Sequence, residues 1–433
     1  MNITPNRYNT SEDKITQQPN NQKFWDLFLI FSLLFLSNLS VLVLVIWLNP
    51  QFVMFETAIW VIASIICLWI LYQQNHINML FRVIKQDWII LPFLLFTGVS
   101  VIWSTNWQIS LYRWLIFIST IITGGFLGIR YGLKDMIKLL SIFGIYILFL
   151  STLLVLLVPG LGVMNYYSIQ GAWKGLFWHK NHMGMIASFF NLVFLFNGIN
   201  SFQLQRKQSI LWGIFYLYSF FVIYASDSVG AFITTILIHA GAFLGYIFIR
   251  YQTKFRKAHY FLLIALLVIG FFVAIVNISE ILALFNRNAS LTGRIPMWGY
   301  LFRNYFTNNQ LIGYGFNAFW YAEPHRIFLQ QAAGYPDPIV IADNGFIDLL
   351  INNGLIGFSL FILFYIGAWW RSTKVATEAK AYSDIFPLIL MSFTLIANLS
   401  WSLLFENENF LMLVVIAVLF CVTMRDLSAQ DNR

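Results

Sequence analysis

The stretch LTGRIPMWGYLFRNYF (residues 291–306) opens the one long segment in which the chain leaves a continuous hydrophobic pattern. The segment runs on through GYGFNAFW (residues 313–320) and YAEPHRIF (residues 321–328), and it ends in IADNGFIDLLINNGLIG (residues 341–357). Apolar runs long enough to cross a bilayer lie before and after it. We therefore predict an all-α, polytopic integral membrane protein with one large extracytoplasmic loop, residues 286–344, that contains short interfacial helices.

The composition agrees with this class of protein. Of the 433 residues, 59% are hydrophobic and only 10% are charged, whereas soluble domains carry about 25% charged residues. The two cysteines, Cys67 and Cys421, lie in apolar runs far apart in the sequence, so we interpret them as packing residues. Residues 1–22 are polar and are predicted to form a disordered cytoplasmic tail.

A transmembrane helix needs about 20 apolar residues, and the sequence offers about twelve such segments. They make up a predicted membrane domain, residues 23–425, which a cytoplasmic tail follows at residues 426–433. The candidate spans are residues 24–48, 53–72, 88–104, 112–129, 138–158, 183–199, 209–225, 229–250, 260–285, 345–370, 384–403 and 408–424.

The positions of Lys and Arg predict the orientation, because cytoplasmic loops are enriched in them. With a cytoplasmic N-terminus, 19 of the 26 basic residues fall on the cytoplasmic side, and both termini lie there. The formal net charge of +8 is then a topology signal, which argues against nucleic acid as a partner. The seven basic residues on the other side are Arg113, Lys174, Lys180, Arg287, Arg294, Arg303 and Arg326.

The loop GAWKGLFWHKNHMG (residues 171–184) concentrates donors that could bind an anion. Lys174, His179 and Lys180 lie within it, beside glycines that permit close approach of the backbone to a ligand. The alternative is an interfacial loop whose lysines contact lipid phosphates. His179 and His182 could also be metal ligands, but no carboxylate or thiolate nearby completes a site, so we expect neither a metal ion nor a cofactor.

An acidic residue, Asp227, lies between two predicted spans in the sequence Ser226-Asp227-Ser228. A charge at a membrane boundary is costly unless it is paired or hydrated. Asp227 could orient a basic residue of a loop, or this group could simply cap the following span.

The large loop contains a predicted helix that begins near Arg294. Thr292 is its predicted N-cap and Pro296 lies in its first turn. Arg294 would combine a guanidinium with the free N–H groups of a helix N-terminus, which suits a phosphate; a solvated surface arginine is the alternative. An interfacial helix is indicated by an apolar stripe at helical spacing, formed by Trp298, Leu301, Phe302 and Tyr305.

Two places in the loop could supply a general base. Asp343, followed by Asn344, lies where the tenth predicted span begins, and burial there would raise its pKa toward neutrality. Alternatively, Asp343 only caps that span, and His325 or Glu323 in a second short helix acts as the base. Arg326, next to His325, is a further candidate for binding phosphate.

Three blocks of sequence resemble the O-antigen ligase and Wzy-type polymerase superfamily, particularly the exopolysaccharide polymerases. They are WKGLFWHKN (residues 173–181), LTGR…MW (residues 291–298) with GYGFNAFW after it, and DNGFIDLLINNGLIG (residues 343–357). The resemblance implies metal-independent transfer of a glycan from polyprenyl diphosphate at the outer face of the inner membrane. The implied partners are that lipid-linked oligosaccharide, membrane lipids and other polysaccharide assembly proteins.

The resemblance also implies roles for single residues. Members of the family hold the diphosphate with basic residues; Arg294 matches one of them, and Lys174 stands where another is usually Arg. Their catalytic base is a His, followed by Asn, Ser or Gln, then by a Gly ten residues later and a small residue three further on. Asp stands here in place of that His, and the frame consists of Asp343, Asn344, Gly354 and Gly357.

These observations favour a polymerase of lipid-linked repeat units for an extracellular polysaccharide, because an Asp in place of the His departs from the ligases. A ligase that transfers the glycan to lipid A-core or to protein is the alternative within the class. A transporter or flippase would place charges within its spans and show related halves. The predicted spans are nearly free of charge and no repeat is visible.

Overall fold

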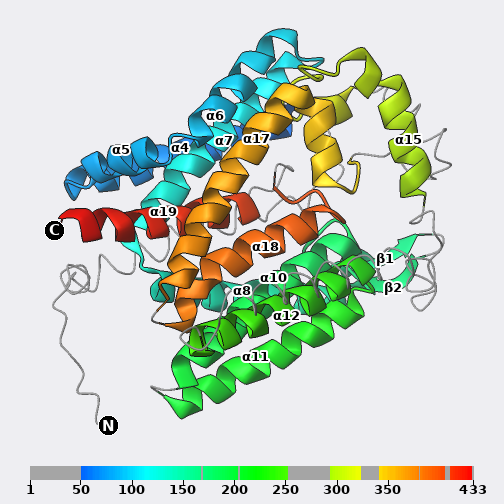
Figure 1. Cartoon of the computed structure of the whole chain (residues 1–433). Helices are drawn as coiled ribbons and strands as arrows, with labels where there is room; N and C mark the ends of the chain where they lie inside the picture. The colour runs from blue at the N-terminus through cyan, green and yellow to red at the C-terminus, as the bar shows by residue number, and fades with distance from the viewer. Residues whose placement is uncertain are drawn as a thin grey trace.

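The computed structural model describes residues 50–166, 169–202, 205–251, 293–322, 341–379, 381–404 and 410–431. Within these ranges the chain is almost entirely helical, with one two-stranded hairpin. The helices pack against one another in the bundle shown in Figure 1.

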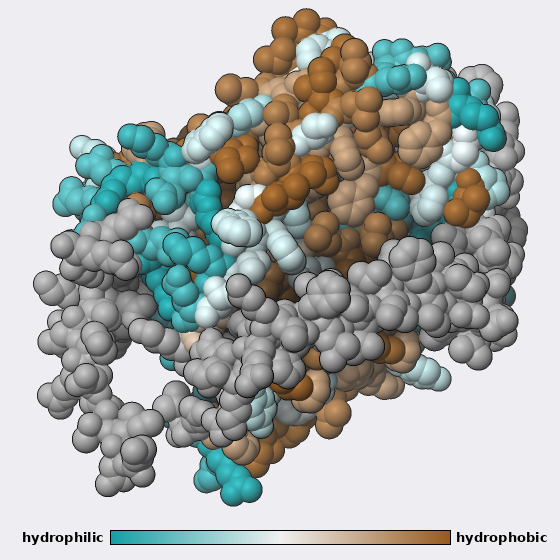
Figure 2. Space-filling view, in the orientation of Figure 1, coloured by the Kyte–Doolittle hydropathy of each residue, from teal (hydrophilic) through white to brown (hydrophobic). Residues whose placement is uncertain are grey.

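Eight helices of the described chain are long and apolar enough to cross a membrane, which confirms the predicted all-α, polytopic class. In Figure 2 a broad apolar surface lies between hydrophilic regions at the two sides of the view. The eight are α4 (Pro50–Gln73), α7 (Trp107–Arg130), α8 (Leu133–Leu157), α10 (Lys180–Phe202), α11 (Arg206–Ala225), α12 (Val229–Tyr251), α17 (Gly345–Thr377) and α19 (Phe410–Asp431).

Two of the predicted spans take a different form. The third is built from α6 (Ile90–Val99) and η2 (Ser100–Trp103), after a 92° bend from a helix that the sequence did not predict, α5 (Ile77–Gln86). The eleventh consists of η5 (Tyr382–Ile385) and α18 (Phe386–Asn398), and at 1.5 Å per residue α18 is shorter than the ~30 Å hydrocarbon core.

The remaining predicted segments fall outside the described residues. These are the first and ninth spans, residues 24–48 and 260–285, and the N-terminal tail, residues 1–22. Within the described chain, the helices thus account for eight membrane crossings, or nine if α5 and α6 form one broken span.

The hairpin lies between α8 and α10, where the sequence predicted only an extracytoplasmic loop. After a short helix, α9 (Pro159–Gly162), strands β1 (Val163–Tyr166) and β2 (Ile169–Trp173) pair antiparallel, with a register shift between Met164 and Asn165. The N–H groups of Lys174 and Gly175 both donate to the carbonyl of Gly162 at 2.9 Å. These two bonds close the base of the hairpin and fix the position of Lys174.

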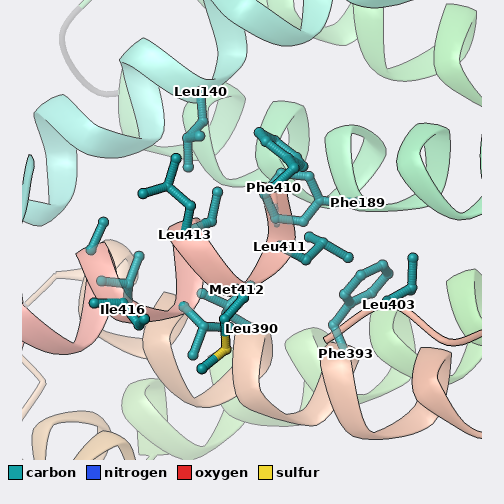
Figure 3. Close-up of a cluster of buried hydrophobic side chains, with 14 of the residues drawn as sticks. Leu140, Phe189, Leu390, Phe393, Leu403, Phe410, Leu411, Met412, Leu413 and Ile416 are labelled. Carbon is teal, nitrogen blue, oxygen red and sulfur yellow. The ribbon is translucent and has the colours of Figure 1, made fainter. Parts of the chain in front are cut away.

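Aromatic side chains pack the core around α10 and α19. Phe410 contacts Phe143, Phe189 and Phe190, with ring centroids 5.6–5.8 Å apart. Figure 3 shows Phe410 and Phe189 with the leucines around them. In the most apolar stretch of each helix, 83% of the residues are buried in α19 but only 22% in α11. Helix α19 is therefore central, whereas α11 is peripheral and turns most of its surface outward.

Polar contacts define two ends of the bundle. At one end, here called the basic end, Arg82 pairs with Asp431, Arg425 pairs with Asp384, and Arg130 donates to Gln74. These arginines are among those that the sequence analysis assigned to one side of a membrane. The opposite end, here called the loop end, carries the hairpin and α15 (Arg294–Asn304), which lie on the same side of the molecule in Figure 1, away from the C-terminus.

Helix α17 is interrupted near the loop end, at Gly354. This residue has φ 62° and ψ −169°, a conformation that is essentially restricted to glycine. The interruption leaves the N–H groups of Leu355 and Ile356 without helical acceptors. They donate instead to the carbonyl oxygens of Gln310 and Leu311, at 2.8 and 3.0 Å.

The same turn of the large loop, residues 310–315, also donates to α17. The N–H groups of Tyr314 and Gly315 bond to the carbonyls of Ile351 and Asn352 at 3.1 and 2.9 Å. Buried backbone groups need partners, and here each segment supplies those that the other lacks. We call residues 310–315 the docked turn; it holds the first part of α17, residues 345–353, at a fixed angle to the rest.

We expect Gly354→Ala to destabilise the protein, because the substitution strains the backbone by about 1–3 kcal/mol and its Cβ would overlap the backbone of Leu311. The matched control is Gly213→Ala in α11, where an added Cβ meets nothing within 4 Å. Thermal unfolding of the purified proteins in detergent should show a lower Tm for Gly354→Ala only. Equal melting temperatures would contradict the requirement for glycine at this break.

Candidate active site

His179 follows the hairpin and precedes α10, at the loop end. Its partly buried ring stacks on the indole of Trp401, with centroids 5.0 Å apart and planes 18° apart. Its Nδ1 lies 3.1 Å from the backbone N–H of Asn181, which donates to it. Because Nδ1 accepts a hydrogen bond, a neutral ring carries its proton on Nε2.

Three cations from two loops act on this imidazole. The pKa of His179 is lowered to about 3, first by burial and then by the charges of Lys180, Arg294 and Lys174. The fold thus brings together four residues that the sequence proposed as anion ligands, although Arg294 lies in a different loop from the other three. At neutral pH the ring of His179 is uncharged, and the positive charge of the cluster comes from the three cations.

Lys180 is held in place by Asp227. Its Nζ donates to the Asp227 carboxylate and, at 2.8 Å, to the Asp227 carbonyl, and its side chain is only 4% exposed. The neighbouring Ser228 caps α12, since its Oγ accepts from the N–H of Ala231 at 3.4 Å. Both sequence-based interpretations of residues 226–228 therefore hold, for different residues.

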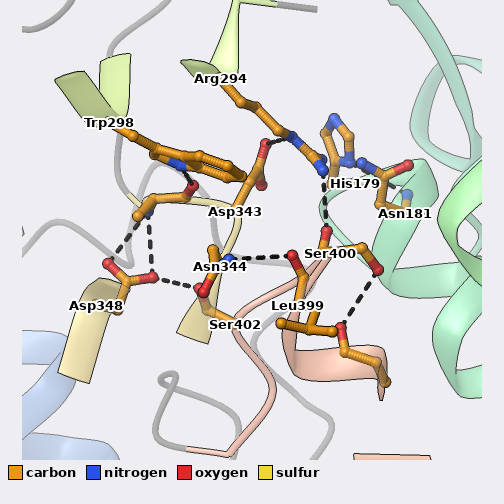
Figure 4. A network of polar contacts seen from close by, with 12 residues as sticks. His179, Asn181, Arg294, Trp298, Asp343, Asn344, Asp348, Leu399, Ser400 and Ser402 are labelled. Atoms are coloured by element: carbon orange, nitrogen blue, oxygen red, sulfur yellow. Dashed lines mark hydrogen bonds and ion pairs between the residues drawn. The ribbon is translucent and has the colours of Figure 1, made fainter. Parts of the chain in front are cut away.

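Arg294 is the first residue of α15 and lies against Asp343. Its Nε donates to Asp343 Oδ2 at 3.0 Å and its Nη1 donates to the carbonyl of Ser400 at 3.2 Å, as Figure 4 shows. The N-cap of α15 is Gly293, with φ 88°, so the prediction that Thr292 caps this helix is wrong. A left-handed turn before Arg294 favours glycine over threonine.

Asp343 has a left-handed backbone, with φ 53°, and does not cap α17. The cap is Asn344, whose Oδ1 accepts from the N–H groups of Phe346 and Ile347 at 3.0 and 3.2 Å, while its Nδ2 donates to the carbonyl of Leu399 at 3.2 Å. The alternative that Asp343 serves only as a helix cap is therefore wrong. Its side chain is 23% exposed and faces Arg294.

The pKa of Asp343 reflects two opposing effects. Burial raises it above the ordinary value, and the charge and hydrogen bond of Arg294 lower it. Burial dominates, so the carboxylate is more basic than a solvated aspartate, yet it lies beside a cation that stabilises its ionised form. This combination suits a group that accepts a proton near neutral pH.

The sequence analysis did not identify one carboxylate that lies near Asp343. Asp348, in the first turn of α17, accepts hydrogen bonds from the Ala342 N–H at 3.1 Å, from Trp320 Nε1 at 2.7 Å and from the Ser402 hydroxyl. The carbonyl of Ala342 accepts from Trp298 Nε1 at 2.7 Å. A lone acid inside an apolar span was the signal that could have identified it.

A charged pair that the sequence analysis missed lies between α4 and α7. Arg113, only 2% exposed, donates to Glu56 at 3.2 Å and to the hydroxyl of Tyr321 at 3.0 Å. The spans are thus less free of charge than the sequence indicated. The contact with Tyr321 ties the end of η4 (Phe319–Tyr321) to the transmembrane helices.

The remaining predicted site residues are Lys174, His325 and Arg326. Lys174 is half-buried, and burial lowers its pKa; no carboxylate of the described ranges forms an ion pair with it. His325 and Arg326 lie outside the described residues. Where the chain is described, no three His, Cys, Asp or Glu side chains form a group suited to a metal ion.

We expect Asn344→Ala to lower the free energy of unfolding by about 1 kcal/mol, the usual cost of losing an N-cap. Asn344→Ser should lose less, because a hydroxyl also caps. Asp343→Asn keeps the cap and the turn, since asparagine tolerates positive φ, but it removes the charge that pairs with Arg294. The melting temperatures of the two Asn344 variants therefore check the assignment, and a loss for Asn344→Ser as large as that for Asn344→Ala would contradict it.

Comparison with known proteins bears on this site directly. Residues 214–362 match the family model described as O-Antigen ligase. The match includes Arg294, Asp343 and Asn344, and it confirms the resemblance to the O-antigen ligase and Wzy-type superfamily. It supports, in general terms, glycosyl transfer of the ligase or polymerase type on lipid-linked oligosaccharides in a membrane. No curated protein matches the chain.

Proposed function

We propose that this chain, similar to the O-antigen ligases over residues 214–362, polymerises polyprenyl-diphosphate-linked oligosaccharide repeat units. It would build an extracellular or surface polysaccharide at the outer face of the inner membrane, by glycosyl transfer that needs no metal ion. The observation that supports this most directly is the cluster of Lys174, Lys180 and Arg294 around His179, in which Arg294 also pairs with the partly buried carboxylate of Asp343. A diphosphate leaving group and a proton acceptor are the two requirements of such a transfer.

The cations would bind and neutralise the diphosphate. Lys174 has no ion-pair partner among the described residues, so its ammonium is the first candidate for a phosphate oxygen. The described contacts of Arg294 use Nε and Nη1, which leaves Nη2 for a second oxygen. His179 would donate from Nε2 as a neutral group. Charge that develops on the leaving diphosphate is thus stabilised by donors already in place.

Asp343 would accept the proton. A hydroxyl oxygen of one lipid-linked glycan attacks the anomeric carbon of another and forms the new glycosidic bond. The bond between that carbon and the phosphate oxygen breaks, and its electron pair leaves with the polyprenyl diphosphate. The hydroxyl proton passes to the carboxylate of Asp343, whose pKa burial raises. His325 would replace Asp343 as the base if the latter only positions substrate, and Arg326 would add positive charge.

A ligase is the second candidate, because the matching family model carries the description O-Antigen ligase. Such an enzyme would use the same cations and the same base but a different acceptor, lipid A-core or protein. We favour the polymerase because Asp343 stands where the resembling ligases have His. The acceptor decides between the two, and the glycans of a deletion strain report on it.

Deletion of the gene should abolish long chains and leave single-repeat glycans, and wild-type protein should restore them. Lys174→Ala, Arg294→Ala and Asp343→Asn should each fail to restore them, with at least the ~100-fold loss that follows removal of a general base in the case of Asp343→Asn. Arg294→Lys should be partly active, because a lysine cannot make the bidentate contact. The measurement is the chain-length distribution at equal protein abundance.

The matched control for these charge changes is Lys207→Ala, at the opposite end of α11 from the site, which should restore full-length chains. If long chains accumulate on the polyprenyl carrier in the deletion strain, the protein acts as a ligase and not as a polymerase. Normal chain lengths from Asp343→Asn would remove Asp343 as the base and direct attention to His325.

The proposed orientation predicts which residues an impermeant thiol reagent reaches. Asn308 and Lys207 are both exposed, at the loop end and at the basic end, and the native Cys67 and Cys421 are buried. A cysteine at position 308, from Asn308→Cys, should react in intact spheroplasts. A cysteine from Lys207→Cys should react only after permeabilisation, and the reverse pattern would invert the proposed topology.

A further inference from the structure

We propose that Asp348 is a positioning residue that holds the catalytic carboxylate of Asp343 in place. This inference rests on the proposed function, because it assigns a task in that reaction to a group that does not touch the substrate. Asp348 lies five residues after Asp343, one turn into α17, and its side chain turns back toward the residue that precedes Asp343, as Figure 4 shows.

The side chains of Asp348 and Trp298 form hydrogen bonds with the backbone of Ala342, the residue before Asp343. Both carboxylate oxygens of Asp348 lie near the Ala342 N–H, at 3.1 and 3.2 Å, and the indole N–H of Trp298 donates to the Ala342 carbonyl at 2.7 Å. On the other side Asn344 is fixed as the N-cap of α17. Asp343 is therefore held on both sides in a left-handed conformation that unconstrained aspartate seldom adopts.

The Asp348 carboxylate also joins two further segments. It accepts from Trp320 Nε1, in η4, at 2.7 Å, and from the Ser402 hydroxyl, in the connection between α18 and α19. The N–H and O–H donors around it satisfy both of its oxygens. One partly buried carboxylate thus links the large loop, the start of α17 and the connection that carries Ser400, the second contact of Arg294.

The charges of Asp343 and Asp348 repel each other. Among the described residues, the other charged or titratable groups near Asp343 are Arg294 from α15 and, before α10, His179, on which Arg294 also acts. The described part of the connection between α18 and α19, residues 399–404, supplies the Ser400 carbonyl to Arg294 and the Ser402 hydroxyl to Asp348. A negative neighbour disfavours ionisation of Asp343, so an ionised Asp348 would partly offset the effect of Arg294.

The sign of the expected change follows from this repulsion. Transfer requires Asp343 to be ionised, so the rate rises with pH through the pKa of this group. We expect Asp348→Asn to lower the pKa of Asp343, because it removes a negative neighbour. The acid limb of the rate profile should then move to lower pH, and the limiting rate should fall because the base is weaker and less well placed.

The experiment measures glycan transfer by the purified full-length protein between about pH 4 and pH 8, with lipid-linked glycan extracted from the deletion strain. For Asp348→Asn we expect the acid limb to shift down by about half a pH unit or more and the maximal rate to fall on the order of 10-fold or more. The matched control is Ser402→Ala, which removes one hydrogen bond but no charge. It should lower the rate less and leave the limb in place.

Several outcomes would overturn the proposal. If the acid limb of Asp348→Asn coincides with the wild-type limb, Asp348 has no electrostatic role, whatever the maximal rate. If Asp348→Asn does not fold, Asp348→Glu retains the charge and should show a lower rate with an unshifted limb; a shifted limb then contradicts the proposal. A wild-type protein that transfers no glycan overturns the proposed function itself, and an active wild type with a normal Asp348→Asn profile overturns only the role of Asp348.

Discussion

The docking of residues 310–315 into the break in α17 is the constraint on which the loop end depends. A helix that spans a membrane satisfies its backbone groups internally, and a break is tolerated only where other groups replace the lost partners. At Gly354 the docked turn supplies carbonyl acceptors for the N–H groups of Leu355 and Ile356. Its own N–H groups donate to carbonyls in the preceding turn of α17. The break therefore permits a change of direction without leaving buried N–H groups unpaired.

This change of direction places the chemistry. The short segment before the break, residues 345–353, begins at the Asn344 cap and carries Asp348, and together these hold the left-handed turn at Asp343. The docked turn in turn positions η4, whose Trp320 donates to Asp348 and whose Tyr321 contacts Arg113. A continuous straight helix would leave no place for the docked turn and would lose this set of contacts.

The charges at the loop end form ion pairs, and an anion could bind to the cations of these pairs. Asp343 pairs with Arg294 and Asp227 pairs with Lys180, so each buried charge is compensated in the absence of substrate, as the low dielectric requires. Lys174 adds a third cation and leaves the cluster with an excess of positive charge. Such a cluster would attract a diphosphate and exchange some internal contacts for contacts with its oxygens.

The sequence predicted the helical class, most span positions, the separation of basic residues and the convergence of Arg294 with Asp343, because hydropathy, Lys and Arg positions and a family frame carry that information. It did not predict the hairpin or the role of Gly354 as a break, since both depend on backbone pairing between segments far apart in the chain. The cap of α15 was assigned to Thr292 instead of Gly293, and the alternative that Asp343 caps α17 is wrong. At α15 and α17 a left-handed residue, Gly293 or Asp343, sets the start, and side-chain preference alone does not reveal its conformation.

The most direct test measures the two products of the reaction together. Purified wild-type protein, mixed with the lipid-linked glycan that accumulates in the deletion strain, should release one polyprenyl diphosphate for each new glycosidic bond. Asp343→Asn and Arg294→Ala should release neither product at a comparable rate. Glycan that crosses the membrane of a proteoliposome while still attached to its lipid, with no diphosphate carrier released, would contradict the account and indicate transport instead of transfer.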